Sequence, residues 1–268
     1  MSDQQELQTI YANRFAGQEA PRERVWKVLT RHYFQQWIRP TDTVLDLGAG
    51  YCEFINNIRA NRKIAVDFNP ETPRRAAPGV EVVMQDVSKP WAVHDTSVDV
   101  VFTSNFFEHL ANKQNFLRCL SEIHRVLRTN GRLIAMGPNI RFCFDVYWDF
   151  LDHHLPLSDR SIREAVEVAG FRTETLIPRF LPFTMQGKLP PSSTLVRMYL
   201  LLPLAWRLLG KQFLLVATKM STRGNRLLHG AGTIHSAGFQ PLPWVEASVD
   251  CQQQQQPYQT ENSQESHS

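Results

Sequence analysis

Two glycines and two aspartates in the first third of the chain have the spacing of a ligand-binding turn. Asp46 precedes Gly48 by two residues, and Gly50 follows, between an apolar run and a helical pattern. Glycines in such a turn let a ligand approach the backbone and reach free N–H groups at the helix start. Asp67 stands at the end of the next apolar run, where a carboxylate can bind the paired hydroxyls of a ribose. The pattern indicates a nucleoside-like ligand.

A third aspartate extends this pattern. Asp86 comes just after a third apolar run, where it can accept a hydrogen bond from an adenine amino group, with the backbone of Val87 adjacent. Asp46 adds a negative charge that favours a cationic part of the ligand. Because the carboxyl ends of parallel strands share one edge of a sheet, acidic residues at three strand ends line the place where such folds bind ligands. The glycine turn alone is weak support, since every doubly wound fold needs one.

Apolar runs that alternate with amphipathic helical patterns must position these residues. The alternation predicts an α/β fold: a Rossmann-like, doubly wound, seven-stranded and mainly parallel sheet with helices on both faces. The expected strands are Val44–Leu47, Lys63–Asp67, Val80–Met84, Val98–Thr103, Arg132–Met136, Phe171–Ile177 and Gln212–Lys219.

Helical periodicity predicts the connecting elements. Apolar residues recur every four positions through Arg22–Trp37, the spacing of one buried helix face, and Pro40 ends that helix. The pair Asn130-Gly131 predicts a turn before the fifth strand. The expected helices lie around Gln5–Phe15 and Arg22–Trp37, through Phe54, Ile55 and Ile58, over Asn112–Leu127, from Ser158 or Ser161 to Gly170, and over Leu195–Leu209.

Composition divides the chain into three parts. Residues 1–40 are expected to form N-terminal helices that cover the site, and residues 41–220 to form the ligand-binding domain. An insertion at 178–211, rich first in proline and then in leucine, separates the sixth and seventh strands. Beyond the last strand the periodicity disappears, and Gln252–Gln256 is an unbroken glutamine run. Residues 221–268 are therefore expected to be a disordered polar tail.

Bulk properties predict a soluble, cytoplasmic protein. The net charge is only +3 over 268 residues, and the absence of a concentrated basic patch argues against tight nucleic-acid binding. The four cysteines are widely separated and form no C-x-x-C pair, which argues against a disulfide framework or a zinc site. The polar N-terminus does not resemble a secretory signal, and the longest apolar segment is too short to span a membrane.

In this order, the motifs resemble those of the class I S-adenosylmethionine-dependent methyltransferases. The likeness covers roughly residues 20–220 and includes an acidic residue before G-x-G, acidic residues after the second and third strands, a fourth strand with its loop, and a helix leading into strand five. The matching positions are Asp46, Gly48, Gly50, Asp67, Asp86, Ser97–Leu110 and His124–Leu133.

One position departs from the family pattern. Cys52 stands where G-x-G-x-G has its third glycine, which is acceptable because S-adenosylmethionine has no pyrophosphate to crowd the helix. A nicotinamide dehydrogenase would need a further glycine where Glu53 stands, and that carboxylate would repel a pyrophosphate. The resemblance therefore implies S-adenosyl-L-methionine as the cofactor. The residues expected to bind it are Asp46, Gly48, Gly50, Asp67, Asp86, Val87 and Asn105.

The resemblance also implies methyl transfer to an acceptor held in line with the donor's S–CH₃ bond. An oxygen or nitrogen acceptor needs a group that takes its proton. Glu108 and His109, in the loop after the fourth strand, are the nearest candidates. His153, in the run Asp152-His153-His154, is a further candidate because that segment overhangs the active site in this fold. Alternatively, His109 caps or packs against the following helix, and His153 lies in a solvated loop.

A metal site is the less favoured interpretation of the same loop. Glu108 and His109 could join Asn105 as ligands, as similar positions do in some quinone-directed relatives. Asn105 is a poor ligand for a catalytic divalent ion compared with a carboxylate, so the sequence predicts no metal. His124 lies within an amphipathic helix and is expected to be structural.

The expected acceptor is a small molecule, a glycan or a lipid-linked compound. The insertion resembles that of bacterial methyltransferases acting on cell-envelope glycans or secondary metabolites, and Ser104–Phe107 lacks the asparagine-proline-proline-aromatic tetrad of base- or glutamine-directed enzymes. The helix Leu195–Leu209 can cover the sheet. Residues 195–211 can instead make peripheral membrane contact, with Arg197, Arg207 and Lys211 near anionic headgroups. The sequence also allows a protein- or RNA-directed methyltransferase, or a non-catalytic binding protein with the same fold.

Overall fold

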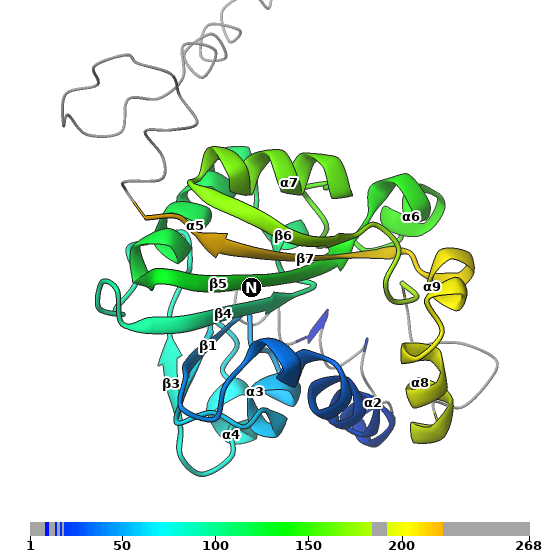
Figure 1. Cartoon of the computed structure of the whole chain (residues 1–268), viewed down its shortest axis with the longest axis horizontal. Helices are drawn as coiled ribbons and strands as arrows, with labels where there is room; N and C mark the ends of the chain where they lie inside the picture. The colour runs from blue at the N-terminus through cyan, green and yellow to red at the C-terminus, as the bar shows by residue number, and fades with distance from the viewer. Residues whose placement is uncertain (1–8, 11–13, 15–16, 18, 184–191, 222–268) are drawn as a thin grey trace, which may run out of the picture. The chain divides into compact units, whose positions relative to one another are not determined.

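The computed structural model describes residues 9–10, 14, 17, 19–183 and 192–221, and within them seven strands form one sheet (Figure 1). The strands are β1 (Thr43–Leu47), β2 (Arg62–Asp67), β3 (Val80–Met84), β4 (Val98–Ser104), β5 (Leu127–Pro138), β6 (Phe171–Ile177) and β7 (Gln212–Lys219). Their order is β3-β2-β1-β4-β5-β7-β6. Strands β1 to β5 are parallel, and β7 is antiparallel to both its neighbours. The predicted seven-stranded, mainly parallel sheet is confirmed.

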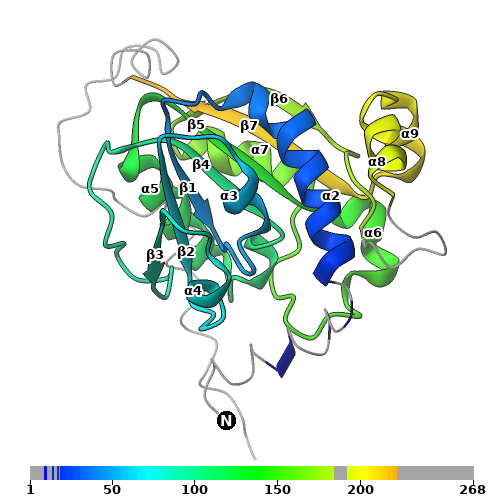
Figure 2. The same ribbon diagram turned by 90° about the horizontal axis from the view of Figure 1, so that it is seen from below.

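Helices cover both faces of the sheet, as Figures 1 and 2 show. The helical elements are α2 (Glu19–His32), η1 (Phe34–Trp37), α3 (Glu53–Asn57), α4 (Thr72–Arg75), η2 (Phe107–His109), α5 (Lys113–Val126), α6 (Ile140–Tyr147), α7 (Asp159–Val168), α8 (Ser193–Leu200) and α9 (Pro203–Leu209). Buried side chains of α5 and α7 share one core cluster with β1, and those of α2, α3 and α8 share another. Because both faces are covered, β1 and β7 are buried along their whole length and lack polar alternation.

Three helices form where their sequences predict. The stretch Arg22–Trp37 becomes α2 followed by the 3-10 turn η1, with Val25 and Leu29 buried on the expected face. The side chain of Asn112 caps α5 by accepting a hydrogen bond from a backbone N–H of its first turn. Of the two candidate starts for α7, Ser158 is the N-cap, and it forms a capping box with Ser161.

Other elements differ from the prediction, including α4, where the sequence predicts no helix. β5 begins at Leu127 rather than after the turn predicted at Asn130, since the chain stays paired with β4 through a register shift that accommodates the left-handed φ of 64° at Asn130. The helix expected over Leu195–Leu209 is two helices, because Pro203 cannot donate the hydrogen bond that would continue α8. Helix α6 is not predicted, and non-helical angles at Cys143 interrupt its periodicity.

Some predictions fall outside the described residues. The helix over Gln5–Phe15 lies mostly outside them, as do residues 184–191 of the insertion and the tail from 222 to 268. The division of the chain into three parts therefore stays a prediction. No helix in the described part of the chain has the length and apolarity needed to cross a membrane.

Candidate active site

The turn after β1 adopts the backbone conformation that its glycines predict. Gly48 and Gly50 have φ of 71° and 52°, in the left-handed region. Phe106 approaches Gly48 so closely that a Cβ added there would stand 2.5 Å from the ring. Cys52, in place of the third glycine, keeps a left-handed φ of 62° and is the N-cap of α3. The chain therefore preserves the shape of the glycine motif, with backbone strain at Cys52 that a glycine would avoid.

Asp67 is tied directly to this turn. Its Oδ2 accepts a hydrogen bond from the backbone N–H of Gly50 at 2.6 Å, and its Oδ1 accepts one from Asn69 at 2.7 Å. The backbone carbonyl of Asp67 accepts a hydrogen bond from the N–H of Gln85 at 3.0 Å, which brings the next residue, Asp86, alongside. The carboxyl ends of β1, β2 and β3 therefore meet at one edge of the sheet.

Asp46 is the most confined of the three aspartates, at 3% exposed. Burial and the neighbouring Asp67 carboxyl raise the pKa of Asp46 well above its usual range, and burial raises the pKa of Asp67 against the hydrogen bonds that it accepts. Among the described residues, no lysine or arginine forms an ion pair with either carboxyl. Two adjacent carboxyls without a cation form a site that a positively charged ligand stabilises.

The remaining predicted cofactor-binding residues lie at the border of this edge. Asp86 accepts hydrogen bonds from the backbone N–H and the hydroxyl of Ser88 at 2.9 and 2.7 Å. Burial acts to raise the pKa of Asp86, but these hydrogen bonds outweigh it and lower the pKa. The carbonyl of Val87 accepts a hydrogen bond from the indole of Trp91 at 3.1 Å. Asn105 is exposed just after β4, with a left-handed φ of 49°.

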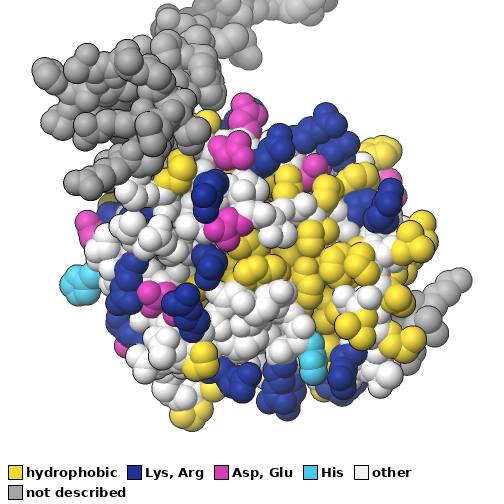
Figure 3. Space-filling model, viewed as in Figure 1, with side chains coloured by type: hydrophobic (Ala, Val, Ile, Leu, Met, Phe, Trp, Pro, Cys, Tyr) yellow, Lys and Arg dark blue, Asp and Glu magenta, His cyan; other side chains and the backbone are white. Residues whose placement is uncertain are grey.

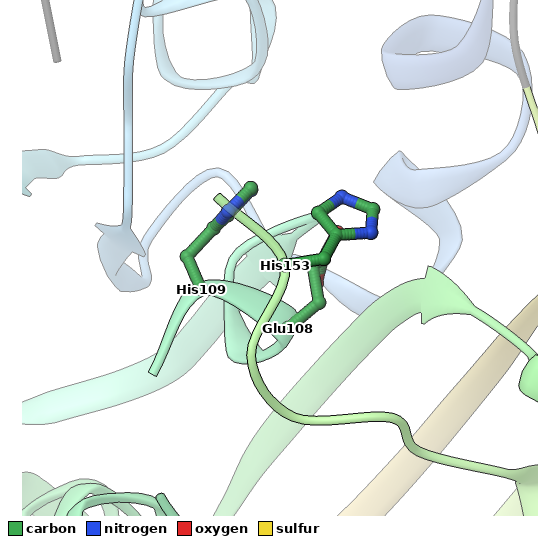
Figure 4. Close-up of side chains that lie close together, drawn as sticks. All are labelled: Glu108, His109 and His153. Atoms are coloured by element: carbon green, nitrogen blue, oxygen red, sulfur yellow. The ribbon is translucent and has the colours of Figure 1, made fainter. Parts of the chain in front are cut away.

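A second group of side chains joins the turn after β4 to a loop far along the chain. Glu108 and His109 lie in η2, and His153 lies in the loop between α6 and α7. The backbone carbonyl of Glu108 accepts hydrogen bonds from the N–H groups of His154 at 2.8 Å and Leu155 at 3.0 Å, which holds the loop against η2. Figure 4 shows the three side chains together, and their carboxylate and imidazole atoms lie within 4.8 Å of one another.

Asp152 positions the imidazole of His109. Nδ1 of His109 lies 2.8 Å from the backbone carbonyl of Asp152 and 3.3 Å from its Oδ2, so Nδ1 donates a hydrogen bond to that carbonyl. Arg14 forms two hydrogen bonds with the Asp152 carboxylate. His109 is also close enough to Asp67 for its charge to lower the pKa of that carboxyl. The second group therefore adjoins the edge that carries the aspartates.

His153 is buried and has an unsatisfied nitrogen. The residue is 6% exposed, and its Nδ1 has no hydrogen-bond partner among the described residues. Its ring stacks on Phe150 with centroids 5.0 Å apart and contacts Tyr147 at 4.6 Å. Because a buried polar atom without a partner is costly, this nitrogen favours the binding of a molecule that can hydrogen-bond to it.

Burial sets the protonation states of the group. It raises the pKa of Glu108 to about 7. Burial and the nearby His109 lower the pKa of His153 to about 4. For Asp152, burial acts to raise the pKa, but hydrogen bonds from Arg14 and the charge of His109 lower it overall. Near neutral pH, therefore, the carboxyl of Glu108 titrates, the imidazole of His153 is neutral, and the neighbouring Asp152 is ionised.

This arrangement can accept a proton from a bound molecule. The three side chains can also hold a divalent cation. The ligand atoms of a tetrahedral site stand about 3.4 Å apart, and here they lie within 4.8 Å of one another. The group differs in membership from the one considered in the sequence, because Asn105 lies outside it and His153 lies inside it.

Sequence reasoning does not identify the whole group. It names Glu108, His109 and His153 separately, but no local spacing pairs Arg14 with Asp152, because their contact joins the chain's start to its middle. His124, expected to be structural, packs its ring against Phe171 in the core with centroids 5.4 Å apart.

Comparisons with known proteins give this site a context. Residues 45–135 match the family described as a methyltransferase domain. An uncharacterised protein of Methanocaldococcus jannaschii is 28% identical over 131 residues, which span 48% of this chain and 54% of that relative, about half its length.

Solved structures share the fold. A complex of the Haloferax volcanii Trm112 methyltransferase activator with a putative methyltransferase contains a chain that matches with a TM-score of 0.58 and 19% identity, over 79% of this chain and 96% of that one. A Thermotoga maritima protein described as a possible histamine N-methyltransferase matches at 0.56 and 17% over 79% and 99%. An S-adenosylmethionine-dependent methyltransferase of Archaeoglobus fulgidus matches at 0.54 and 19% over 72% and 92%. At these identities the likeness concerns the fold.

The fold is a doubly wound domain whose strand-end aspartates meet at one edge of the sheet. Residues 45–135 match a methyltransferase domain, and the chain has the fold of the S-adenosylmethionine-dependent methyltransferases. A methyltransferase domain of this fold implies S-adenosyl-L-methionine as the cofactor.

Proposed function

We propose that this chain transfers a methyl group from S-adenosylmethionine to an oxygen or nitrogen of a small-molecule, glycan or lipid-linked acceptor. The observation that carries the proposal is the meeting of Glu108, His109 and His153 beside the aspartate-lined edge. A site that only bound the cofactor would need no buried carboxyl and imidazole next to it. Such titratable pairs with shifted pKa values are typical of proton transfer.

The aspartate-lined edge fits the cofactor. Asp67 has both oxygens oriented by backbone N–H groups, so its remaining lone pairs can accept hydrogen bonds from the ribose hydroxyls. Asp46 supplies a buried carboxyl whose ionised form the cationic end of the donor would stabilise. When bound, the donor would supply an electrophilic methyl group. Asp86 and the backbone of Val87 would bind the adenine, and Asn105 would border the donor near the acceptor.

The second group would manage the acceptor. The unsatisfied Nδ1 of His153 would hydrogen-bond the acceptor's hydroxyl or amino group and fix its direction toward the methyl group. The methyl carbon would exchange its bond to the donor sulfur for one to the acceptor atom. The acceptor's proton would pass to the carboxylate of Glu108, whose pKa of about 7 suits proton acceptance near neutral pH. His109, oriented by Asp152, would stabilise the ionised form of Glu108.

The test measures which class of molecule receives a labelled methyl group. The full chain would be incubated with methyl-labelled S-adenosylmethionine and, separately, small-molecule, lipid, protein and RNA fractions of cells. We expect label in the small-molecule or lipid fraction, lost in Asp67→Ala and strongly reduced in Glu108→Gln. Exposed Glu23→Gln on α2 is a matched control that should retain activity. Label only in protein or RNA would support a macromolecule-directed enzyme. The absence of both labelling and cofactor binding would support a non-catalytic relative.

A further inference from the structure

The two helices of the insertion carry apolar side chains on their outer side. Leu201, between the helices, is 79% exposed, and Leu208 in α9 is 69% exposed. We call the exposed apolar residues of this segment the leucine patch. It comprises Leu195, Met198, Leu201, Leu202, Leu204, Leu208 and Leu209. A helix that merely covers a sheet normally has a polar outer side, so these residues need a separate explanation.

The inner side of the same helices is packed independently of the patch. Leu200 is buried, and Trp206 packs against the same core cluster. The hydroxyl of Tyr199 donates a hydrogen bond to the carbonyl of Phe180 at 2.5 Å, and the indole of Trp206 donates one to the carbonyl of Tyr199 at 2.7 Å. The helices are therefore held in place by their inner residues, which leaves the leucine patch available for another surface.

Helix α6 continues this surface. Its Phe144 and the following Trp148 are 71% and 61% exposed. Arg179 links α6 to α9, because its guanidinium lies over the ring of Phe142 at 4.8 Å and donates hydrogen bonds to the carbonyls of residues 208 and 210. Figure 3 shows hydrophobic side chains gathered broadly on the side of the molecule that carries α8 and α9, with Lys and Arg side chains around them.

The charge of the segment that carries the patch has one sign. Between Glu174 and Glu246 the sequence contains no acidic residue, although the segment includes several lysines and arginines. Within it, Arg197 and Arg207 are exposed on the two helices, whereas Lys211, after α9, pairs with Asp145 of α6 at 3.4 Å. The leucine patch, whose own segment supplies only cations, complements an anionic lipid headgroup layer, and a protein interface would not require this bias.

We infer that the leucine patch docks this chain on the surface of a bilayer that contains anionic lipids. The leucines enter the interface between headgroups and acyl chains, and the arginines contact the phosphates. The two helices have 8 and 7 residues, a length suited to lying in the interface and not to crossing it. The inference does not depend on the identity of the methyl acceptor.

Vesicle sedimentation tests this docking. The full chain would be mixed with phosphatidylcholine vesicles with or without phosphatidylglycerol at low and high salt. We expect the anionic vesicles to bind the chain about tenfold more strongly than neutral ones at low salt, and less at high salt. Leu204→Asp with Leu208→Asp should lose about tenfold or more in binding. Val168→Asp with Met84→Asp, two exposed apolar residues outside the patch, should retain it.

Two further variants separate charge from apolar contact. Arg197→Glu with Arg207→Glu should remove the preference for anionic vesicles. Arg160→Glu with Arg163→Glu, exposed on α7, gives the same change in net charge and should keep that preference. A second measurement uses the native side chains: brominated lipid should quench the fluorescence of exposed Trp148, and Trp148→Phe should remove that quenching.

Three results would overturn the inference. The first is absence of binding to anionic vesicles at low salt, with no quenching by brominated lipid. The second is vesicle binding that both patch variants retain while their melting temperatures match the native chain. The third is a dimer, seen by light scattering without lipid and lost in Leu204→Asp with Leu208→Asp, because the patch would then be covered by a second copy of the chain.

Discussion

The aspartate-lined edge and the group of Glu108, His109 and His153 lie side by side but are assembled in different ways. The edge takes Asp46, Asp67 and Asp86 from the ends of three successive strands, and a backbone hydrogen bond from Gly50 to Asp67 locks two of those ends together. The group takes Glu108 from the turn after β4 and His153 from the loop between α6 and α7. The edge therefore follows from the topology of the sheet, whereas the group follows from the packing of one particular loop.

Their electrostatics differ as well. The carboxyls of Asp46 and Asp67 have no partner cation among the described residues and have raised pKa values, which suits a cationic cofactor. Asp152 is held ionised by Arg14 and orients His109, while Glu108 is poised to titrate. This contrast suggests that the edge determines binding and the group determines rate. Variants of the edge should therefore leave the rate of methyl transfer by the bound enzyme nearly unchanged. Variants of the group should leave the affinity for the cofactor nearly unchanged.

The largest expected effect is on the rate. Glu108→Gln and His153→Gln should each lower the rate of methyl transfer by about 10² to 10⁴-fold, because the acceptor loses its proton acceptor or its orienting hydrogen bond. The dissociation constant for S-adenosylmethionine should change by less than about threefold, under 1 kcal/mol. Single-turnover rates with labelled cofactor and calorimetry on the same preparations measure the two quantities. Equal losses in both quantities would show that edge and group act as one unit.

The next effect is on stability and depends on pH. The pKa of Glu108 is raised from 4.5 to about 7 in the folded chain, so its contribution to stability is present below pH 4.5 and lost as the pH rises through 7. At pH 8 this loss is about 3 kcal/mol, and Glu108→Gln should recover it. At pH 5 the variant should gain little.

His153 should act in the opposite direction. Its pKa is lowered from 6.5 to about 4, so its contribution is present above pH 6.5 and lost as the pH falls toward 4. Urea unfolding of the native chain, Glu108→Gln and His153→Gln between pH 5 and 8 provides the measurement. A stabilisation by Glu108→Gln that is larger at pH 5 than at pH 8 would contradict the assignment of the raised pKa.

A smaller effect concerns the glycine turn alone. Gly48→Ala places a Cβ 2.5 Å from the ring of Phe106 and should cost about 1 to 3 kcal/mol beyond the backbone strain, with weaker cofactor binding. Gly79→Ala is the matched control, since its φ of 88° is also left-handed but its Cβ would meet nothing within 4 Å. Urea unfolding and cofactor titration compare the two variants. Equal losses would show that the approach of Phe106 is unimportant.

The smallest effect concerns the positioning of His109. Arg14→Ala removes the hydrogen bonds that hold Asp152 and should reduce the rate by about tenfold, roughly 1 to 2 kcal/mol. The pH profile of the rate should also shift, because the pKa of Asp152 would rise. Arg14→Lys, which keeps the charge, should restore most of the profile. An unchanged profile in Arg14→Ala would assign Arg14 to structure only.

The fold was largely predictable because its signals are local. Runs such as Val98–Thr103 are mainly apolar since both faces of the sheet are covered. Ser158 with Ser161 marks a helix start by its own hydrogen bonds. Helix α6 has no such signal, because Cys143 departs from helical angles. The division of the insertion at Pro203 could have been predicted from the cost of a proline inside a helix.

The site was predictable in part. The aspartates occur at fixed positions in the strand–turn–helix pattern, so their convergence follows from topology. Backbone hydrogen bonds from His154 and Leu155 to the carbonyl of Glu108 hold the loop of His153 beside Glu108, and no side-chain pattern encodes them. The same holds for Arg14 and Asp152. Contacts between distant segments depend on loop packing, and the sequence could name these residues only as separate candidates.

The most direct test is a calorimetric titration of the native chain, Asp67→Ala and His153→Gln with S-adenosylmethionine, on preparations whose thermal unfolding shows them to be folded. We expect micromolar binding, about −8 kcal/mol, for the native chain and His153→Gln, and no detectable heat for Asp67→Ala. Native affinity in Asp67→Ala, or a silent titration of the native chain itself, would contradict the proposal that the strand-end carboxylates hold the methyl donor.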